Sequence, residues 1–214
     1  MPAGLFVLND YGSVQIDDNW KNWGFKQLIP LSVHIAAGTN FNANTYSLSV
    51  AGEAVLIAPV STNLAVSVVR TEFSGGVWTY HFIILRQFAL GFDETETAYI
   101  YVFDAMPGSS FSNVGLEVFN ALSQRVFHSD MNPLKARDVL PGSSGFTGDT
   151  GKTYAPLALT HTRHFDPTNG IQYWGLRSFG SFITAMEHNV AGGGFFGTSI
   201  NAGLYAAVDV TGLS

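Results

Sequence analysis

The residues with the clearest capacity for chemistry are the histidines and aspartates near position 160. His161 and His164 lie three positions apart and Asp166 follows them. Imidazole and carboxylate groups are common ligands of zinc and other transition metals. If residues 155–164 form a strand, however, side chains three positions apart point to opposite faces of the sheet. The spacing therefore predicts ordinary polar residues, and we expect no metal and no other cofactor.

Hydrolytic chemistry is also weakly supported. A glycosidase or lyase needs two carboxylates across a groove, one with a raised pKa, but Asp104, Asp130, Asp138 and Asp166 are spread along the chain. No Gly-x-Ser-x-Gly pentapeptide occurs, so a nucleophilic serine lacks its usual setting. The glycine run at 192–197 lacks the Lys-Ser/Thr that ends a phosphate-binding loop. We predict that the protein is not an enzyme.

Composition indicates a folded chain with little charge. Hydrophobic residues make up 46% of the 214 residues and charged residues 12%, which is far from the composition of disordered segments. The net charge is −6, with 16 acidic and 10 basic residues, and Lys and Arg are not clustered. Nucleic-acid binding is therefore not expected. The chain has no cysteine, which excludes disulfides, thiolate zinc sites and a cysteine nucleophile.

Membrane insertion and export are not expected. The segment Met1 to Val7 has no basic region and no long apolar stretch, and the Ile83–Leu85 run is too short to cross a bilayer. A weakly charged surface rich in Ser, Thr, Asn and Gly suits a subunit packed into an assembly.

An internal repeat is the strongest sign of organisation. The pattern Gly-Leu-x-Val-x-Asn occurs at Gly4–Asn9 and again at Gly115–Asn120. After a one-residue shift, Val14 corresponds to Val126 and Asp18 to Asp130. Alternating apolar residues followed by turn residues are typical of a β-hairpin. The chain is therefore expected to use one hairpin twice.

The rest of the chain reads as short strands separated by Gly, Pro, Asn and Ser. We predict an all-β fold of two tandem, related, antiparallel β-sandwich-like units, 1–110 and 111–214, divided at the Pro/Gly/Ser-rich segment 106–110. Helices are nearly absent, and Glu94–Thr97 is expected to be a charged loop. The expected strands in the two units are Leu31–Ile35, Thr45–Val50, Ala54–Ile57, Leu64–Thr71, Val77–Leu85 and Ala98–Phe103, then Val126–His128, Ala155–Thr162, Gln172–Trp174, Ser181–Met186 and Gly203–Val210.

Aromatic residues in expected loops are the candidate interaction surface. Trp20 and Trp23 lie in one such segment, and Phe195 and Phe196 follow the glycine run; both segments are expected to make subunit contacts. Tyr173-Trp174 could stack on a sugar ring, as could the other tryptophans, although such aromatics more often fill cores or interfaces.

The doubled hairpin resembles a family of small proteins from tailed bacteriophages. The resemblance rests on Gly4–Asn9 followed by Val14–Asp17, and on Gly115–Asn120 followed by Val126–Ser129 and Pro133-Leu134. Members of that family look like virion proteins of the tail tip, baseplate or tail fibre. The second copy departs from the first by having Ser123 where the first has Gly12. The resemblance implies a structural role and no catalytic residue.

The resulting functional expectation is a structural protein of the phage tail that acts by protein–protein assembly. Its partners would be other phage tail proteins, in a symmetric homo-oligomer or in multiple copies, and it would be made in the host cytoplasm and reside in the virion. The alternative is a receptor- or carbohydrate-binding module that contacts a host surface glycan. An enzyme acting on surface polysaccharide ranks last.

Overall fold

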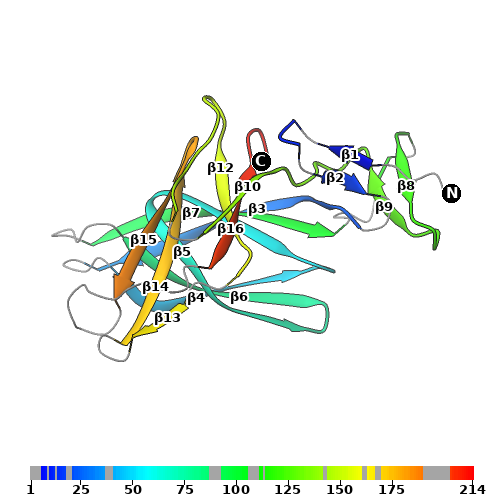
Figure 1. Cartoon of the computed structure of the whole chain (residues 1–214). Coiled ribbons are helices and arrows are strands. Elements are labelled where there is room, and N and C mark those ends of the chain that lie inside the picture. The colour runs from blue at the N-terminus through cyan, green and yellow to red at the C-terminus, as the bar shows by residue number, and fades with distance from the viewer. Residues whose placement is uncertain are drawn as a thin grey trace.

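Figure 1 shows the computed structural model of the chain, in which every described element is a β-strand. The all-β prediction is confirmed. The structure describes residues 6–8, 10–12, 14–17, 21–36, 41–86, 93–105, 111–112, 114–141, 144–160, 163–166, 170–189 and 203–214. Within these ranges it gives the backbone alone at 6, 14–15, 17, 41–45, 85–86, 163–166, 170–175, 179 and 185–189.

One long strand, β5 (Leu56–Ser74), belongs to two layers. Its first residues pair with β7 (Glu94–Ala105), which also pairs along its whole length with β3 (Trp23–Ile35). Its later residues pair with β6 (Val77–Arg86), and β6 pairs with β4 (Phe41–Ala51). The change of partner follows Ser61, whose hydroxyl accepts a hydrogen bond from the backbone N–H of Leu64 at 3.2 Å.

The later part of the chain extends the second layer and adds a third. Strand β14 pairs with β5 through Leu176–Val66 and Ser178–Ser61. On its other side β14 pairs with β15, and β15 pairs with β11. A separate three-stranded sheet has the order β10-β16-β12. The bounds of these strands are β10 (Ala136–Pro141), β11 (Phe146–Thr147), β12 (Tyr154–Ala158), β13 (Arg163–Asp166), β14 (Gly170–Phe179), β15 (Phe182–Asn189) and β16 (Leu204–Asp209).

Three hydrophobic clusters hold the layers together, and strands that lie between two layers, such as β12 and β16, bury consecutive side chains. The largest lies between the β3–β7 sheet and the β4–β6 sheet, and includes Phe82, Ile84 and Ile100. The second packs Phe103 and Ala58 against β12 and β16. The third joins β11, β14 and β15 to the same two strands. The sheet of β3, β7 and the start of β5 is thus covered on both faces.

Four short strands form a separate small module at one end of the molecule (Figure 1). The hairpin β1 (Phe6–Leu8) with β2 (Val14–Asp17) and the hairpin β8 (Glu117–Phe119) with β9 (Arg125–His128) are both antiparallel. Their buried side chains share one cluster, which contains Ile16, Val118, Val126, Phe127 and Met131. We call this four-stranded unit the hairpin module.

The two hairpins are the same structure built twice. Both carry a register irregularity at the same place, between Val7 and Leu8 in the first and between Val118 and Phe119 in the second. Val7 pairs with Ile16 as Val118 pairs with Phe127. The expected one-residue shift is therefore wrong. Val14 pairs with Leu8, and in the second hairpin Arg125, not Val126, pairs with the equivalent Phe119. A constant offset relates the two hairpins, and it places Ser123 at the position of Gly12.

The repeated Gly and Asn of the motif have a physical reason in the second copy. Gly115 has φ 146°, and a Cβ there would lie 2.2 Å from the hydroxyl oxygen of Ser129. That hydroxyl accepts a hydrogen bond from the N–H of Leu116 at 3.1 Å. The Asn120 side-chain oxygen accepts from the N–H groups of Leu122 and Gln124 and closes the turn. Gly4 and Asn9 lie outside the described residues.

Strands from the two predicted units, 1–110 and 111–214, are joined in the structure. Strand β14 pairs with β5, the two hairpins share a cluster, and an isolated bridge links Gly24 to Pro133. The predicted boundary, residues 106–110, lies outside the described part of the chain. The structure thus connects both halves through one nine-stranded sheet.

Several strand boundaries differ from the predictions. The expected strands Ala54–Ile57 and Leu64–Thr71 are parts of the single strand β5. Glu94–Thr97, expected to be a loop, begins β7, because it pairs with Ser32–Ile35. Strand β3 begins at Trp23 although Gly24, Lys26 and Pro30 interrupt the apolar pattern, since β7 supplies a full-length partner. Strand β10 was not expected from its mixed sequence and forms by pairing with β16.

A polar network around the buried Asp209 carboxylate ties the hairpin module to the other strands, which we call the body. The Tyr11 hydroxyl, in the first hairpin turn, donates to Asp209 at 3.0 Å and lies 3.1 Å from the Tyr154 hydroxyl. Lys152 also donates to Asp209 at 3.0 Å, and the Arg137 guanidinium lies 4.7 Å from the centre of the Tyr11 ring. Burial and then these hydrogen bonds raise the pKa of Tyr11 well above its usual value. Burial by itself favours the neutral acid at Asp209, but hydrogen bonds from Thr211, Lys152 and Tyr11 lower its pKa overall.

The two hairpin turns offer a matched test of backbone strain. Ser123 has φ 59°, and it is the one residue other than glycine with a positive φ in the described chain; the equivalent Gly12 has φ 76°. A residue other than glycine at a positive φ of this size lowers the free energy of unfolding by about 1 kcal/mol. Ser123→Gly should therefore raise the free energy of unfolding, and Gly12→Ala should lower it, each by about 1 kcal/mol. Urea unfolding checks both, and equal signs would contradict the proposed equivalence of the two turns.

The Asp209 network predicts acid sensitivity. Because the native pKa of Asp209 lies below the unfolded value of about 4, the native state binds fewer protons and stability is lost as pH falls through the native pKa. Between about pH 4 and pH 2 the wild type should lose more unfolding free energy than Asp209→Asn. Asp138→Asn, at an exposed carboxylate of β10, is the control. Urea midpoints at several pH values measure the effect, and parallel pH profiles for wild type and Asp209→Asn would contradict it.

Candidate functional site

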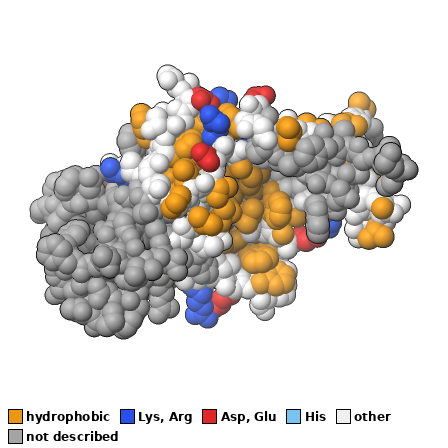
Figure 2. All heavy atoms as spheres, viewed as in Figure 1, with side chains coloured by type: hydrophobic (Ala, Val, Ile, Leu, Met, Phe, Trp, Pro, Cys, Tyr) orange, Lys and Arg blue, Asp and Glu red, His pale blue; other side chains and the backbone are white. Residues whose placement is uncertain are grey.

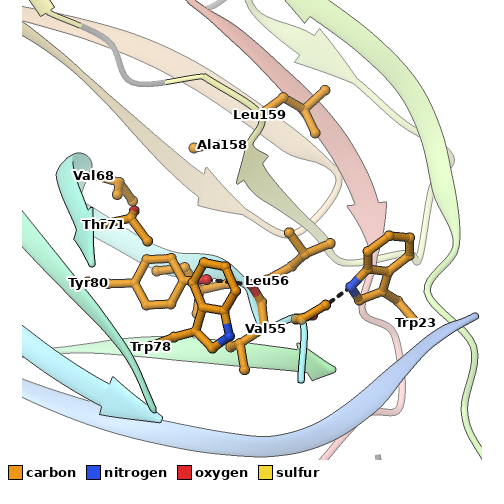
Figure 3. A pocket seen from close by; sticks show the side chains of 11 residues that line it. Trp23, Val55, Leu56, Val68, Thr71, Trp78, Tyr80, Ala158 and Leu159 are labelled. Carbon is orange, nitrogen blue, oxygen red and sulfur yellow. Dashed lines mark hydrogen bonds between the residues drawn. The ribbon is translucent and has the colours of Figure 1, made fainter. Parts of the chain in front are cut away.

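The structure contains a pocket of about 300 Å³ with aromatic walls. Figure 3 shows Trp23 on one side, Trp78 and Tyr80 on another, and Leu159 across from them. The lining residues are Trp23, Ala54, Val55, Leu56, Ile57, Val68, Thr71, Trp78, Tyr80, Ala158 and Leu159. Hydrophobic side chains also gather around a recess in the middle of the face shown in Figure 2. The size and the largely apolar lining are typical of ligand sites.

Four parts of the fold build this pocket. Trp23 begins β3, and Leu56 begins β5 next to the tight segment that follows β4. Trp78 and Tyr80 project from β6, where alternate residues share one face. Leu159 follows the end of β12, and its N–H donates to the carbonyl of Leu204 at 2.9 Å. The walls therefore come from segments far apart in the sequence.

Ala54 and Val55 line one wall of the pocket, and the segment 51–55 to which they belong is held from several sides. The Trp23 indole N–H donates to the Ala54 carbonyl at 2.7 Å, and the Tyr80 hydroxyl donates to the Val55 carbonyl at 2.5 Å. Lys26 donates to the Ala51 carbonyl at 2.5 Å. Two of the aromatic walls are thus oriented by hydrogen bonds to the same short segment. Such a site is positioned before any ligand arrives.

Asp104 is the centre of this arrangement. Its carboxylate accepts hydrogen bonds from the N–H groups of Glu53 (3.1 Å), Ala54 (3.0 Å) and Ala105 (2.9 Å). Lys26 adds a salt bridge at 2.8 Å. A Cβ on Gly52 would lie 2.4 Å from Asp104 Oδ2, so glycine is needed where the chain passes this carboxylate. Asp104 is buried and fully paired, which indicates a structural role and not an acid or base.

Tyr80 links the core to the pocket. Its side chain is buried, and burial raises its pKa to about 12, with a further contribution from the negative charge of Asp104. The hydroxyl therefore stays protonated at neutral pH and keeps donating to the Val55 carbonyl. The phenol ring faces the pocket, as Figure 3 shows.

Trp78 is the wall residue with an unsatisfied polar group. Its indole nitrogen is buried and has no hydrogen-bond partner among the described residues. The exposed Phe73 ring packs against the same indole, with ring centres 4.8 Å apart. None of the lining residues is charged. The pocket therefore has mainly apolar surfaces and no ionic group, and one unpaired donor is enclosed within its wall.

The structure brings one predicted interaction residue, Trp23, into this pocket. Trp20, Phe195 and Phe196 lie outside the described residues. Tyr173 and Trp174 belong to β14, where only the backbone is described, paired with β13 and β15. Sequence reasoning named Trp78 among the tryptophans that could stack on a sugar, but it did not place Trp78 beside Trp23 and it missed Tyr80 and Leu159. No local signal links residues that far apart.

The residues weighed for other chemistry are dispersed. Asp104 lies in β7 and Asp138 in β10, while Asp130 accepts from the N–H of Ser112 at 2.7 Å. Among the described side chains no group of three or more His, Asp or Glu could hold a metal ion. The side chains of His161, His164 and Asp166 fall outside that set. In the part of the chain that the structure describes, no helix is long and apolar enough to cross a membrane.

The hairpin module carries a second candidate surface. Exposed large hydrophobic side chains gather on it although it is small, and Val114 and Leu122 are the most exposed, at 82% and 77%. The group consists of Leu8, Val114, Leu116, Phe119 and Leu122. Leu8 and Phe119 occupy equivalent positions in the two hairpins. Apolar side chains gathered in this way mark interaction surfaces.

No family model matches this chain, and no curated protein or solved structure matches it either.

Removing the carboxylate beneath the pocket should destabilise the protein. Asp104→Ala leaves three N–H groups and Lys26 without their partner, and the loss of a buried paired charge costs about 3 kcal/mol. Glu53→Ala, which removes the exposed salt bridge to Lys21, should cost less than about 1 kcal/mol. Urea unfolding of both variants measures the difference. Equal effects would contradict a central role for Asp104.

Proposed function

We propose that this protein is a structural subunit of a bacteriophage tail that acts by protein–protein assembly. The support is the pair of equivalent hairpins, of which one contacts the protein's own body and the other presents the same tip to solvent. In the first, Tyr11 reaches Asp209 and Tyr154. In the second, the equivalent Leu122 is 77% exposed.

The same turn in two environments supports a role in docking. The first turn shows that this hairpin can attach to a β-sheet body through one side chain at its tip. The second turn carries a leucine at that position, which favours an apolar contact over a hydrogen-bonded one. Phe119 and Leu116 are further exposed apolar side chains of the same hairpin. A neighbouring tail subunit that covers these side chains would remove them from water.

The rest of the molecule suits a repeated building block. Extensive pairing joins distant segments of the body, and few residues are charged. Symmetric assemblies place the same surface against a neighbour in each copy. Under this proposal the protein resides in the virion, in multiple copies, with other tail proteins as its partners.

The double substitution Phe119→Ser and Leu122→Ser tests the second hairpin. Both side chains are exposed, so the variant should fold and should lose its complex with a neighbouring tail protein. Val139→Ser, at a side chain of similar exposure on β10, should leave the complex intact. Light scattering of each purified variant, alone and mixed with each tail protein of the same phage, gives the answer.

Each outcome decides one part of the proposal. An unchanged complex with the double variant would place the contact elsewhere on the surface. If the wild type forms neither a homo-oligomer nor a complex with any tail protein, the structural role itself is wrong.

A further inference from the structure

We propose that the pocket between Trp23 and Trp78 binds one neutral sugar ring, as part of a larger glycan. This inference is independent of the hairpin module and of the assembly role. It differs in place from the Tyr173-Trp174 pair that the sequence suggested for glycan contact.

The absence of charge in the pocket disfavours an anionic ligand. No lining side chain carries a charge, and the nearby Asp104 already has four hydrogen-bond donors. Bringing a phosphate or carboxylate into such a site would require desolvating an anion without a counter-charge. Anions alone are excluded on this ground, because the faces of the indole and phenol rings would attract a cation. A neutral ligand is favoured over a cation by the unpaired Trp78 N–H, which needs an acceptor oxygen.

The aromatic walls select a ligand with flat apolar faces. Trp23 and Trp78 present indole rings on two sides of the space (Figure 3), and the Phe73 ring packs against Trp78 with ring centres 4.8 Å apart. Indole rings combine a large apolar face with a single polar edge. A pyranose has C–H groups on its faces and hydroxyls at its rim, so it can use both kinds of surface.

The unpaired donor favours a hydroxylated ligand over a hydrocarbon. The Trp78 indole N–H is buried without a partner, and an unsatisfied buried donor calls for an explanation. Because the nitrogen is enclosed in the present rotamer, a small rotation of the ring must accompany binding. A hydroxyl oxygen of the sugar would then accept this hydrogen bond, whereas an acyl chain would leave it unmade.

The size and the open rim of the pocket fit one sugar unit of a glycan. A volume of about 300 Å³ lies at the small end of ligand sites. Trp23 and Leu159 are 39% and 48% exposed at its rim, so adjoining sugar units could continue into solvent. A peptide segment would need a longer groove.

Intrinsic tryptophan fluorescence and calorimetry test the site with the methyl glycosides of glucose, galactose, mannose and N-acetylglucosamine. At least one should bind with a dissociation constant in the millimolar range, and glucuronic acid should bind more weakly. Trp23→Ala should weaken binding at least about 10-fold, and Trp78→Phe, which keeps a ring but removes the N–H, should weaken it about threefold to tenfold. Trp174→Phe is the control and should bind as the wild type does.

Two results would overturn the inference. One is the absence of saturable binding for all four glycosides at concentrations well above the millimolar range. The other is binding that survives Trp23→Ala and Trp78→Phe or is lost in Trp174→Phe, which would place the sugar elsewhere. Thermal melting of each variant shows whether a lost signal reflects unfolding, and Trp23→Phe replaces Trp23→Ala if the latter does not fold.

Discussion

The constraint on which the body depends is that β5 pairs in two sheets at once. Its beginning pairs with β7 and its later part with β6, so the positions of both layers are set by one continuous backbone. The change occurs just past Ser61, where side chain and backbone cooperate in a local hydrogen bond. The same strand then receives β14 from the second half of the chain. The pocket follows from this arrangement, because Leu56 and Thr71 reach it from the two parts of β5.

Two buried aspartates, Asp104 and Asp209, hold segments that strand pairing alone would leave unattached. Asp104 binds the segment after β4 by backbone N–H groups and Lys26. Asp209 holds the first hairpin through Tyr11 and the turn after β16 through Thr211. A buried carboxylate is stable only when its hydrogen bonds are made, so each one specifies its neighbours strictly. Asp104 orients the segment that lines the pocket, and Asp209 holds the hairpin module. The two candidate interaction surfaces are thus attached through different carboxylates.

The repeat shows how one structure can serve two surroundings. The hairpins share a bulge, a positive φ in the turn and a common cluster. Their tips differ in sequence, and at one pair of equivalent positions Tyr11 is engaged by the body whereas Leu122 faces solvent. Local hydrogen bonds at Asn120 and the backbone at Gly115 explain why Gly and Asn recur in the sequence pattern. Whether a hairpin turn contacts the body depends on which residues lie next to it, and the fold of the rest of the chain places those residues.

The sequence by itself determined the all-β class, the two hairpins and most strand positions, because alternation and turn residues act over a few neighbours. It misassigned Glu94–Thr97 and the start of β3, where pairing between distant segments overrides local preference. It identified Trp23 and Trp78 as candidates for sugar stacking but could not place them together, since 55 positions separate them along the chain. Only the tertiary structure decided that they share a pocket with Tyr80, and that Asp104 is a fully paired structural group. The physical reason is that strand pairing and buried hydrogen bonds connect residues that are distant in the sequence. A local sequence pattern carries no information on such contacts.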